Sequence, residues 1–175
     1  MTAELIVDAR NATGESPVWS AEEQALYWVD IPAGQLYRWS PADNRTQQWT
    51  APQMLACIAR CRDGGWIAGM QSGLFHLQPG TDGSLHSRPL SSVAHARPAM
   101  RFNDGRCDRQ GRFWAGTMVR EMSLARPAGG LYRTDAAGLS APLVQGLVTQ
   151  NGLGFSPDGR TMYLSDSHPS VQKIW

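Results

Sequence analysis

Oxygen-bearing side chains open three similar stretches of this chain of 175 residues. Glu15 begins "ESPVWS", Asn103 begins "NDGRCD" and Asn151 begins "NGLGFS". Carboxylate and amide oxygens, with no thiolate or imidazole among them, suit a hard or borderline divalent cation such as calcium, magnesium or manganese. If the fold brings the three stretches together, the pattern predicts a cation site built from oxygen ligands.

A local structural role explains each of these residues as well. Glu15 can accept backbone N–H groups within the turn Gly-Glu-Ser-Pro, and Asn151-Gly152 is a dipeptide typical of tight turns. Asn103 precedes Asp and Gly, a pattern that often caps a turn. The cation hypothesis therefore depends on whether the three residues occupy equivalent places in a repeated unit.

The chain does contain a repeat. The stretch "ESPVWSAEEQALYWVD" (15–30) aligns without a gap on "NGLGFSPDGRTMYLSD" (151–166), which pairs Asp30 with Asp166. A third copy, "NDGRCDRQGRFWAGT" (103–117), fits after deletion of one residue. In this alignment Glu15, Asn103 and Asn151 share one position.

A weaker fourth copy at 57–70 keeps the order of apolar run, polar turn and apolar run. The unit recurs about every 45 residues, which is typical of the blades of a β-propeller. A β-sandwich with accidental similarity is the alternative. In a propeller the innermost strand of each blade lines the central axis, so the residues that open the copies would converge there.

The predicted fold is therefore all-β, with a single partial β-propeller domain over residues 1–175. About four blades are expected, and "VQKIW" at the C-terminus matches only the opening of a third strand in the last blade. An unfinished blade exposes unpaired ladder groups. We therefore expect either a fragment of a longer protein or an assembly, such as self-association through the unpaired blade edges, that supplies the missing blades.

Charge and composition narrow the partners. Sixteen basic and fifteen acidic residues give a net charge of +1, which attracts neither nucleic acid nor an anionic membrane. A small molecule is the expected partner. The N-terminus lacks a signal-peptide pattern, and the three cysteines lack the spacing of a zinc ribbon or a disulfide framework. These features predict a cytoplasmic protein without a histidine- or cysteine-based metal site.

Three motifs resemble those of a known family. "GESPVW", "RFNDGRCDRQGRFWAGTM" and "QNGLGFSPDGRTMYLSDS" are similar to the signature stretches of the senescence marker protein, regucalcin and gluconolactonase family of six-bladed propellers. The resemblance runs along essentially the whole chain and keeps the order and spacing of the family's motifs. It implies a metal-dependent lactonase that hydrolyses a sugar lactone to the aldonic acid.

The resemblance also implies roles for individual residues. Glu15 and Asn151 would bind one divalent ion, with calcium expected first and zinc, magnesium or manganese as alternatives. Arg101, Asn103 and Glu121 would contact the hydroxyl groups of the sugar. The family's third metal ligand, an Asp that is also its proposed general base, belongs to a blade beyond Trp175. Catalysis by this chain alone is therefore in doubt.

Two other functions compete with the lactonase. The first is a propeller that only binds, with a structural calcium held by the axial oxygens. The second is a six-bladed enzyme of the paraoxonase or strictosidine-synthase type. The pair of motifs "RFNDG" and "GTM" favours the sugar lactonase over both.

Overall fold

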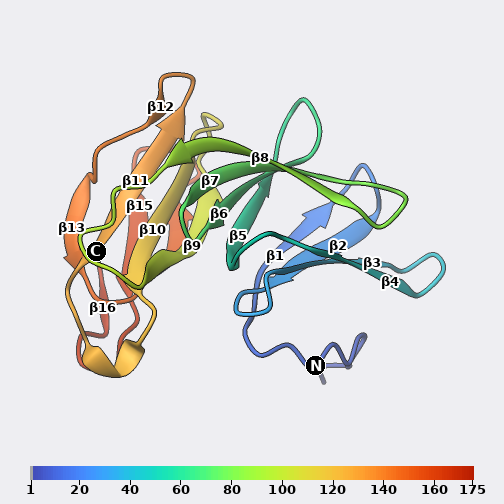
Figure 1. The fold of residues 1–175 in the computed structure, drawn as a ribbon, viewed down its shortest axis with the longest axis horizontal. Helices are drawn as coiled ribbons and strands as arrows, with labels where there is room; N and C mark the ends of the chain where they lie inside the picture. The colour runs from blue at the N-terminus through green and yellow to red at the C-terminus, as the bar shows by residue number, and fades with distance from the viewer. Residues whose placement is uncertain (1) are drawn as a thin grey trace.

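The computed structural model describes residues 2–175, which form four antiparallel sheets along the chain (Figure 1). The first sheet contains β1 (Gly14–Ser20), β2 (Ala25–Asp30), β3 (Gln35–Ser40) and β4 (Arg45–Thr50). The second contains β5 (Leu55–Arg60), β6 (Trp66–Met70), β7 (Gly73–Pro79) and β8 (Leu85–Ser92). In both sheets the strands pair in the order in which they occur in the sequence.

The third and fourth sheets follow the same plan. The third contains β9 (Met100–Cys107), β10 (Phe113–Val119), β11 (Gly129–Asp135) and β12 (Gly138–Leu139), and β13 (Val144–Leu147) pairs with β11. The fourth contains β14 (Gln150–Phe155), β15 (Met162–Asp166) and β16 (Lys173–Ile174). A single 3-10 turn, η1 (Met122–Leu124), is the only helical element among residues 2–175. Within these residues, no helix has the length and apolar character needed to cross a bilayer.

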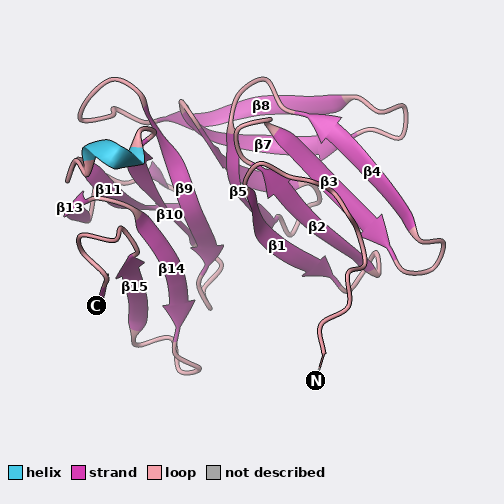
Figure 2. Cartoon of the chain, turned by 90° about the horizontal axis from the view of Figure 1, so that it is seen from below, coloured by secondary structure: helices cyan, strands magenta, loops and turns pink. Residues whose placement is uncertain are grey.

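The sheets are the blades of a β-propeller, as the repeat predicts. The first strand of each blade contacts the first strand of the next, from β1 to β5, β9 and β14. Figure 2 shows β9 and β14 side by side and pointing in the same direction. Because the innermost strands run in the same direction, the residues near their N-terminal ends lie at the same end of the propeller axis.

Apolar side chains between the blades form the core. Trp66 and Phe102 are fully buried, and Tyr27 of the first blade contacts Trp66 of the second with ring centroids 4.4 Å apart. Apolar burial stabilises by about 25 cal/mol per Å². The packing of one blade on the next therefore fixes the places of the innermost strands.

Buried aspartates confirm the alignment of the first and fourth blades. Asp30 accepts hydrogen bonds from the backbone N–H groups of residues 12 and 13, both at 3.0 Å. Asp166 accepts the equivalent bonds from residues 148 and 149, at 2.7 and 2.8 Å. Each carboxylate ties the end of its second strand to the segment that enters the first strand.

A β-bulge follows Glu15 in β1 and Asn151 in β14. The register of β1 shifts between Glu15 and Val18, and that of β14 shifts between Asn151 and Gly154. Gly152 has φ +58°, and a Cβ there would lie 2.5 Å from Ser165 Oγ. Asn151-Gly152 therefore belongs to a bulge inside a strand, where glycine allows both the positive φ and the close contact.

The expected position of Asn103 in the repeat is wrong. The backbone bond from residue 120 to residue 99 is equivalent to those from 31 to 13 and from 167 to 149. Counting from these bonds, Arg101, opposite Met118, is the counterpart of Glu15 and Asn151. Arg101 and its partner Met118 are 17 positions apart (118 − 101), whereas Glu15 and Val29, and Asn151 and Ser165, are 14 apart (29 − 15 and 165 − 151). The hairpin of β9 and β10 is therefore longer than its counterparts, and an alignment that deletes one residue there misplaces Asn103.

Candidate active site

Glu15 and Asn151 line the same cavity, although they belong to the first and fourth blades. The cavity has a volume of about 600 Å³, is open to solvent and is lined by residues of the innermost strands. Its lining includes Glu15, Asp104 and Asn151 near the beginnings of these strands and Trp19, Arg60 and Arg106 near their ends. The end at which the strands begin therefore presents two carboxylates and an amide.

The Glu15 carboxylate is exposed to the cavity. Within residues 2–175 its oxygens take part in no hydrogen bond or ion pair with another side chain, so both remain available to a ligand. Burial lowers the pKa of Arg101, and the negative charge of Glu15 opposes that effect. The charge of Glu15 therefore favours the charged form of Arg101.

Asn151 is held at both ends of its amide group. Its Nδ2 donates to Ser167 Oγ at 3.2 Å, and its Oδ1 accepts from the backbone N–H of Gly152 at 3.1 Å. A carbonyl oxygen has two lone pairs, so one remains for a cation or a donor in the cavity. The side chain is thus oriented before a ligand arrives.

Arg101 and Asn103 form one hydrogen-bonded unit. Arg101 Nη1 donates to Asn103 Oδ1 and to the carbonyl of Phe102, both at 2.8 Å. Asn103 Nδ2 donates to the carbonyl of Gln150 at 2.7 Å, and Asn103 is only 9% exposed. The Asn103 amide thus connects the guanidinium of Arg101 to β14.

Glu121 lies in the loop between β10 and β11 and is exposed. Its carboxylate accepts hydrogen bonds from Ser123 N at 3.2 Å and Ser123 Oγ at 2.5 Å, and these bonds lower its pKa. The loop is held by a contact of His168 Nε2 with the carbonyl of Met122 at 3.1 Å. To contact a sugar, the Glu121 carboxylate would have to accept a further hydrogen bond or lose those from Ser123.

The structure brings the predicted site residues together only in part. Glu15 and Asn151 meet at the cavity, whereas Arg101, Asn103 and Glu121 are not among the described residues that line it. Asp104 of "RFNDG" also lines the cavity, and its Oδ2 accepts from Leu153 N at 3.1 Å. The sequence left its role open between the site and the stabilisation of a turn, because an Asp before Gly is typical of turns.

The oxygen donors at this end of the cavity fit a hard divalent cation. Glu15 and Asn151 offer one carboxylate and one amide oxygen, and calcium takes six to eight oxygen ligands. Within residues 2–175, no group of three or more His, Cys, Asp or Glu side chains is arranged as a metal site. Further oxygens would have to come from water, the substrate or another part of the protein.

The fold and the cavity define a β-propeller with polar residues gathered at one end of its axis. The sequence profile described as the SMP-30/Gluconolactonase/LRE-like region matches residues 13–175. The chain belongs to this family, as its motifs predict.

Relatives of the chain include named sugar lactonases. It is 39% identical over 166 residues to a 6-deoxy-6-sulfogluconolactonase of Pseudomonas putida, covering 95% of this chain and 55% of that protein. It is 34% identical to an L-arabinolactonase of Azospirillum brasilense, covering 94% and 54%. It is also 32% identical to regucalcin of Xenopus laevis, covering 94% and 55%. The chain therefore spans about half the length of these relatives.

Solved structures show the same fold. Regucalcin of Agrobacterium tumefaciens, described as a calcium-binding protein, superposes with a TM-score of 0.83 at 26% identity, covering 93% of this chain and 53% of that one. A luciferin-regenerating enzyme gives a TM-score of 0.81 at 22% identity, covering 94% and 60%. The second likeness concerns the fold alone.

Proposed function

We propose that the full-length protein hydrolyses a sugar lactone to the corresponding aldonic acid at the cavity lined by Glu15 and Asn151. The observation that carries the proposal is the convergence of these two residues, from the first and fourth blades, on one cavity. The names of the sugar lactonases to which the chain is similar support the choice of substrate class.

Glu15 and Asn151 would hold a divalent cation, and calcium is the first candidate. A bound cation of this kind polarises a carbonyl oxygen and stabilises negative charge that develops on it. One neutral ligand beside one carboxylate leaves more positive charge for the substrate than two carboxylates would. The calcium-binding description of a regucalcin with the same fold agrees with this choice.

Arg101 would orient the lactone by donating hydrogen bonds to its oxygens. The guanidinium carries five N–H donors, and the two hydrogen bonds of Nη1, to Asn103 and to the Phe102 carbonyl, leave the donors of Nε and Nη2 for a ligand. Asn103 would act here mainly through Arg101, since both ends of its amide already bind protein groups. Glu121, in the neighbouring loop, would accept a hydrogen bond from a hydroxyl group of the sugar.

The proton of the attacking water needs a base. The family resemblance assigns that role to an Asp beyond Trp175, so the proposal concerns the full-length protein. A cytoplasmic location, which the sequence predicts, is part of the proposal.

Acid release from aldonolactones tests the proposal. Full-length protein, chelated and then supplied with calcium, zinc, magnesium or manganese, would be mixed with glucono- and arabinono-lactones in a pH-stat. We expect cation-dependent acid release above the spontaneous rate. Thermal stabilisation by the cation without acid release would instead identify a non-catalytic propeller with a structural ion.

A further inference from the structure

Two adjacent residues of β9 bind the backbone of β14 on either side of Asn151. Asn103 Nδ2 donates to the carbonyl of Gln150 at 2.7 Å, and Asp104 Oδ2 accepts from the N–H of Leu153 at 3.1 Å. Both residues lie at the point where the register between β9 and β10 shifts. The bulge of β9 therefore holds the bulge of β14.

The bulge of β14 lacks regular ladder bonding of its own. Between Asn151 and Gly154 its register with β15 is interrupted, and a bulge leaves its extra residue unpaired. Contacts from outside the fourth sheet therefore add to the bonds that Asn151 makes with Ser167 and Gly152 in fixing the backbone of this bulge. The hydrogen bond from Leu153 to Asp104 is such a contact, two residues after Asn151.

We propose that Asp104 is a positioning residue, which holds the bulge of β14 so that the amide oxygen of Asn151 faces the cavity. Both carboxylate oxygens of Asp104 are used by backbone groups, since Oδ1 accepts from Gly105 N at 2.9 Å and Oδ2 from Leu153 N. This use favours positioning over a role as general base. The inference rests on the proposed function only where it treats Asn151 as a cation ligand.

The bulge of the first blade is also bound by a neighbouring blade. Ser16, the bulge residue after Glu15, has φ +53° and accepts from Ile58 N of the second blade at 2.9 Å through its Oγ. Each of the two predicted ligands is therefore followed by a bulge that is tied to the innermost strand of an adjacent blade. Blade packing and ligand direction are coupled at both places.

Asp104→Ala and Asp104→Asn test the proposal in the full-length protein. Hydrogen exchange of the segment 150–155 would be measured without any metal, and calcium affinity would be measured by calorimetry. Asp104→Ala should speed exchange in this segment and weaken calcium binding, each by about tenfold, the value of one lost hydrogen bond to a charged group. Asp104→Asn keeps one acceptor and should give smaller changes in both.

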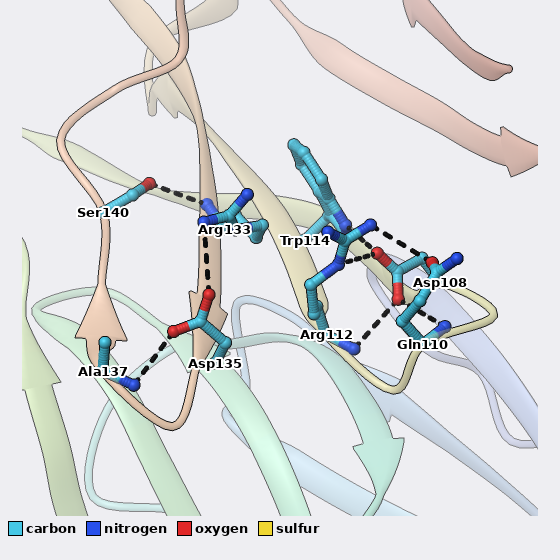
Figure 3. Close-up of polar contacts among 8 residues, drawn as sticks. All are labelled: Asp108, Gln110, Arg112, Trp114, Arg133, Asp135, Ala137 and Ser140. Carbon is cyan, nitrogen blue, oxygen red and sulfur yellow. Dashed lines mark hydrogen bonds and ion pairs between the residues drawn. The ribbon is translucent and has the colours of Figure 1, made fainter. Parts of the chain in front are cut away.

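Asp108→Ala is the matched control. Asp108 follows β9 at the other end of the blade, where it accepts hydrogen bonds from Arg112 Nε at 2.6 Å and Trp114 Nε1 at 2.8 Å (Figure 3). Its loss should lower the melting temperature without selective change in segment 150–155 or in calcium affinity. The control separates general destabilisation from loss of positioning.

Unchanged exchange in segment 150–155 of Asp104→Ala would overturn the proposal, whatever happens to calcium binding. Faster exchange together with wild-type calcium affinity would overturn it too. If the wild-type protein binds no calcium or other divalent cation, the proposed function fails. In that case, faster exchange confined to residues 150–155 in Asp104→Ala would still show that Asp104 stabilises β14.

Discussion

The amide group of Asn151 makes two hydrogen bonds and can still make a third contact through its oxygen. Its nitrogen is fixed by Ser167 and its oxygen by the next backbone N–H, which leaves one lone pair toward the cavity. Glu15 differs, because its carboxylate has no side-chain partner within residues 2–175. In the proposed site, Asn151 is thus oriented before a cation binds, and Glu15 would supply the negative charge.

Glu15→Gln should weaken calcium binding about tenfold or more, because it removes one unit of negative charge from the cation's surroundings while keeping the size of the side chain. Calorimetric titration of the full-length protein measures the effect. Glu22→Gln is the control, since Glu22 is exposed and pairs only loosely with Arg60, at 3.5 Å. Equal calcium affinities of the two variants would show that Glu15 is not a ligand of the cation.

The sequence predicts the pairing of Glu15 and Asn151 but not the place of Asn103. The first prediction succeeds because the first and fourth blades have equal spacing from their buried aspartates to their bulges. The second fails because the hairpin of β9 and β10 is longer than the first hairpins of the other two blades, with 17 positions between Arg101 and Met118 (118 − 101) against 14 between Glu15 and Val29 (29 − 15). The extra residues are divided between the two strands and their turn, so no single gap in the sequence pattern marks them.

At the scale of the element, the bulge in β14 depends on Gly152. Gly152→Ala should destabilise the protein by about 1–2 kcal/mol, because an Ala at φ +58° is strained and its Cβ would meet Ser165 Oγ. Urea unfolding of the full-length protein measures this loss. The change should also weaken calcium binding, since Gly152 N contacts the Asn151 oxygen.

Gly154→Ala provides the control in the same strand. A Cβ at Gly154 would lie 3.9 Å from Tyr163 Cβ, which is an ordinary van der Waals contact. We expect an unfolding free energy close to that of the wild type. Equal losses for the two variants would show that positive φ at Gly152 is not the feature that matters.

At the scale of the whole molecule, acid should destabilise the propeller partly through Asp108, whose side chain is 2% exposed. Burial alone would raise its pKa, but hydrogen bonds from Trp114 and Arg112 outweigh burial and lower it. A lowered folded pKa gives stability that is present above the unfolded value of about 4 and lost as pH falls through the folded value.

Thermal unfolding from pH 5 downward checks this, with Asp108→Asn as the comparison. The variant should be less stable near neutral pH, and its melting temperature should fall less as the solution becomes acidic. Each kcal/mol of difference corresponds to about 3 °C for a domain of this size. Parallel curves for the two proteins would mean that Asp108 does not contribute to the acid transition.

The sequence predicts much of the architecture because each blade has the same order of apolar runs and turns. It does not predict how Asn103 and Asp104 reach across to β14, since those contacts depend on how neighbouring blades pack. It also does not predict the exposed position of Glu121, whose carboxylate accepts from Ser123 within its own loop. The sequence pattern within each repeat determines the strands of a blade, whereas contacts between neighbouring blades determine how the candidate site residues are arranged.

A double-mutant cycle on lactone hydrolysis tests the central claim, that Glu15 and Asn151 serve one catalytic cation. Acid release by full-length wild type, Glu15→Gln, Asn151→Ala and the double variant would be measured at one calcium concentration, the lowest that saturates the wild type. Each single change should lower the rate by about 100-fold or more, and the double change should add little, because one shared ion can be lost only once. Losses that multiply in the double variant, or wild-type rates in either single variant, would contradict the account.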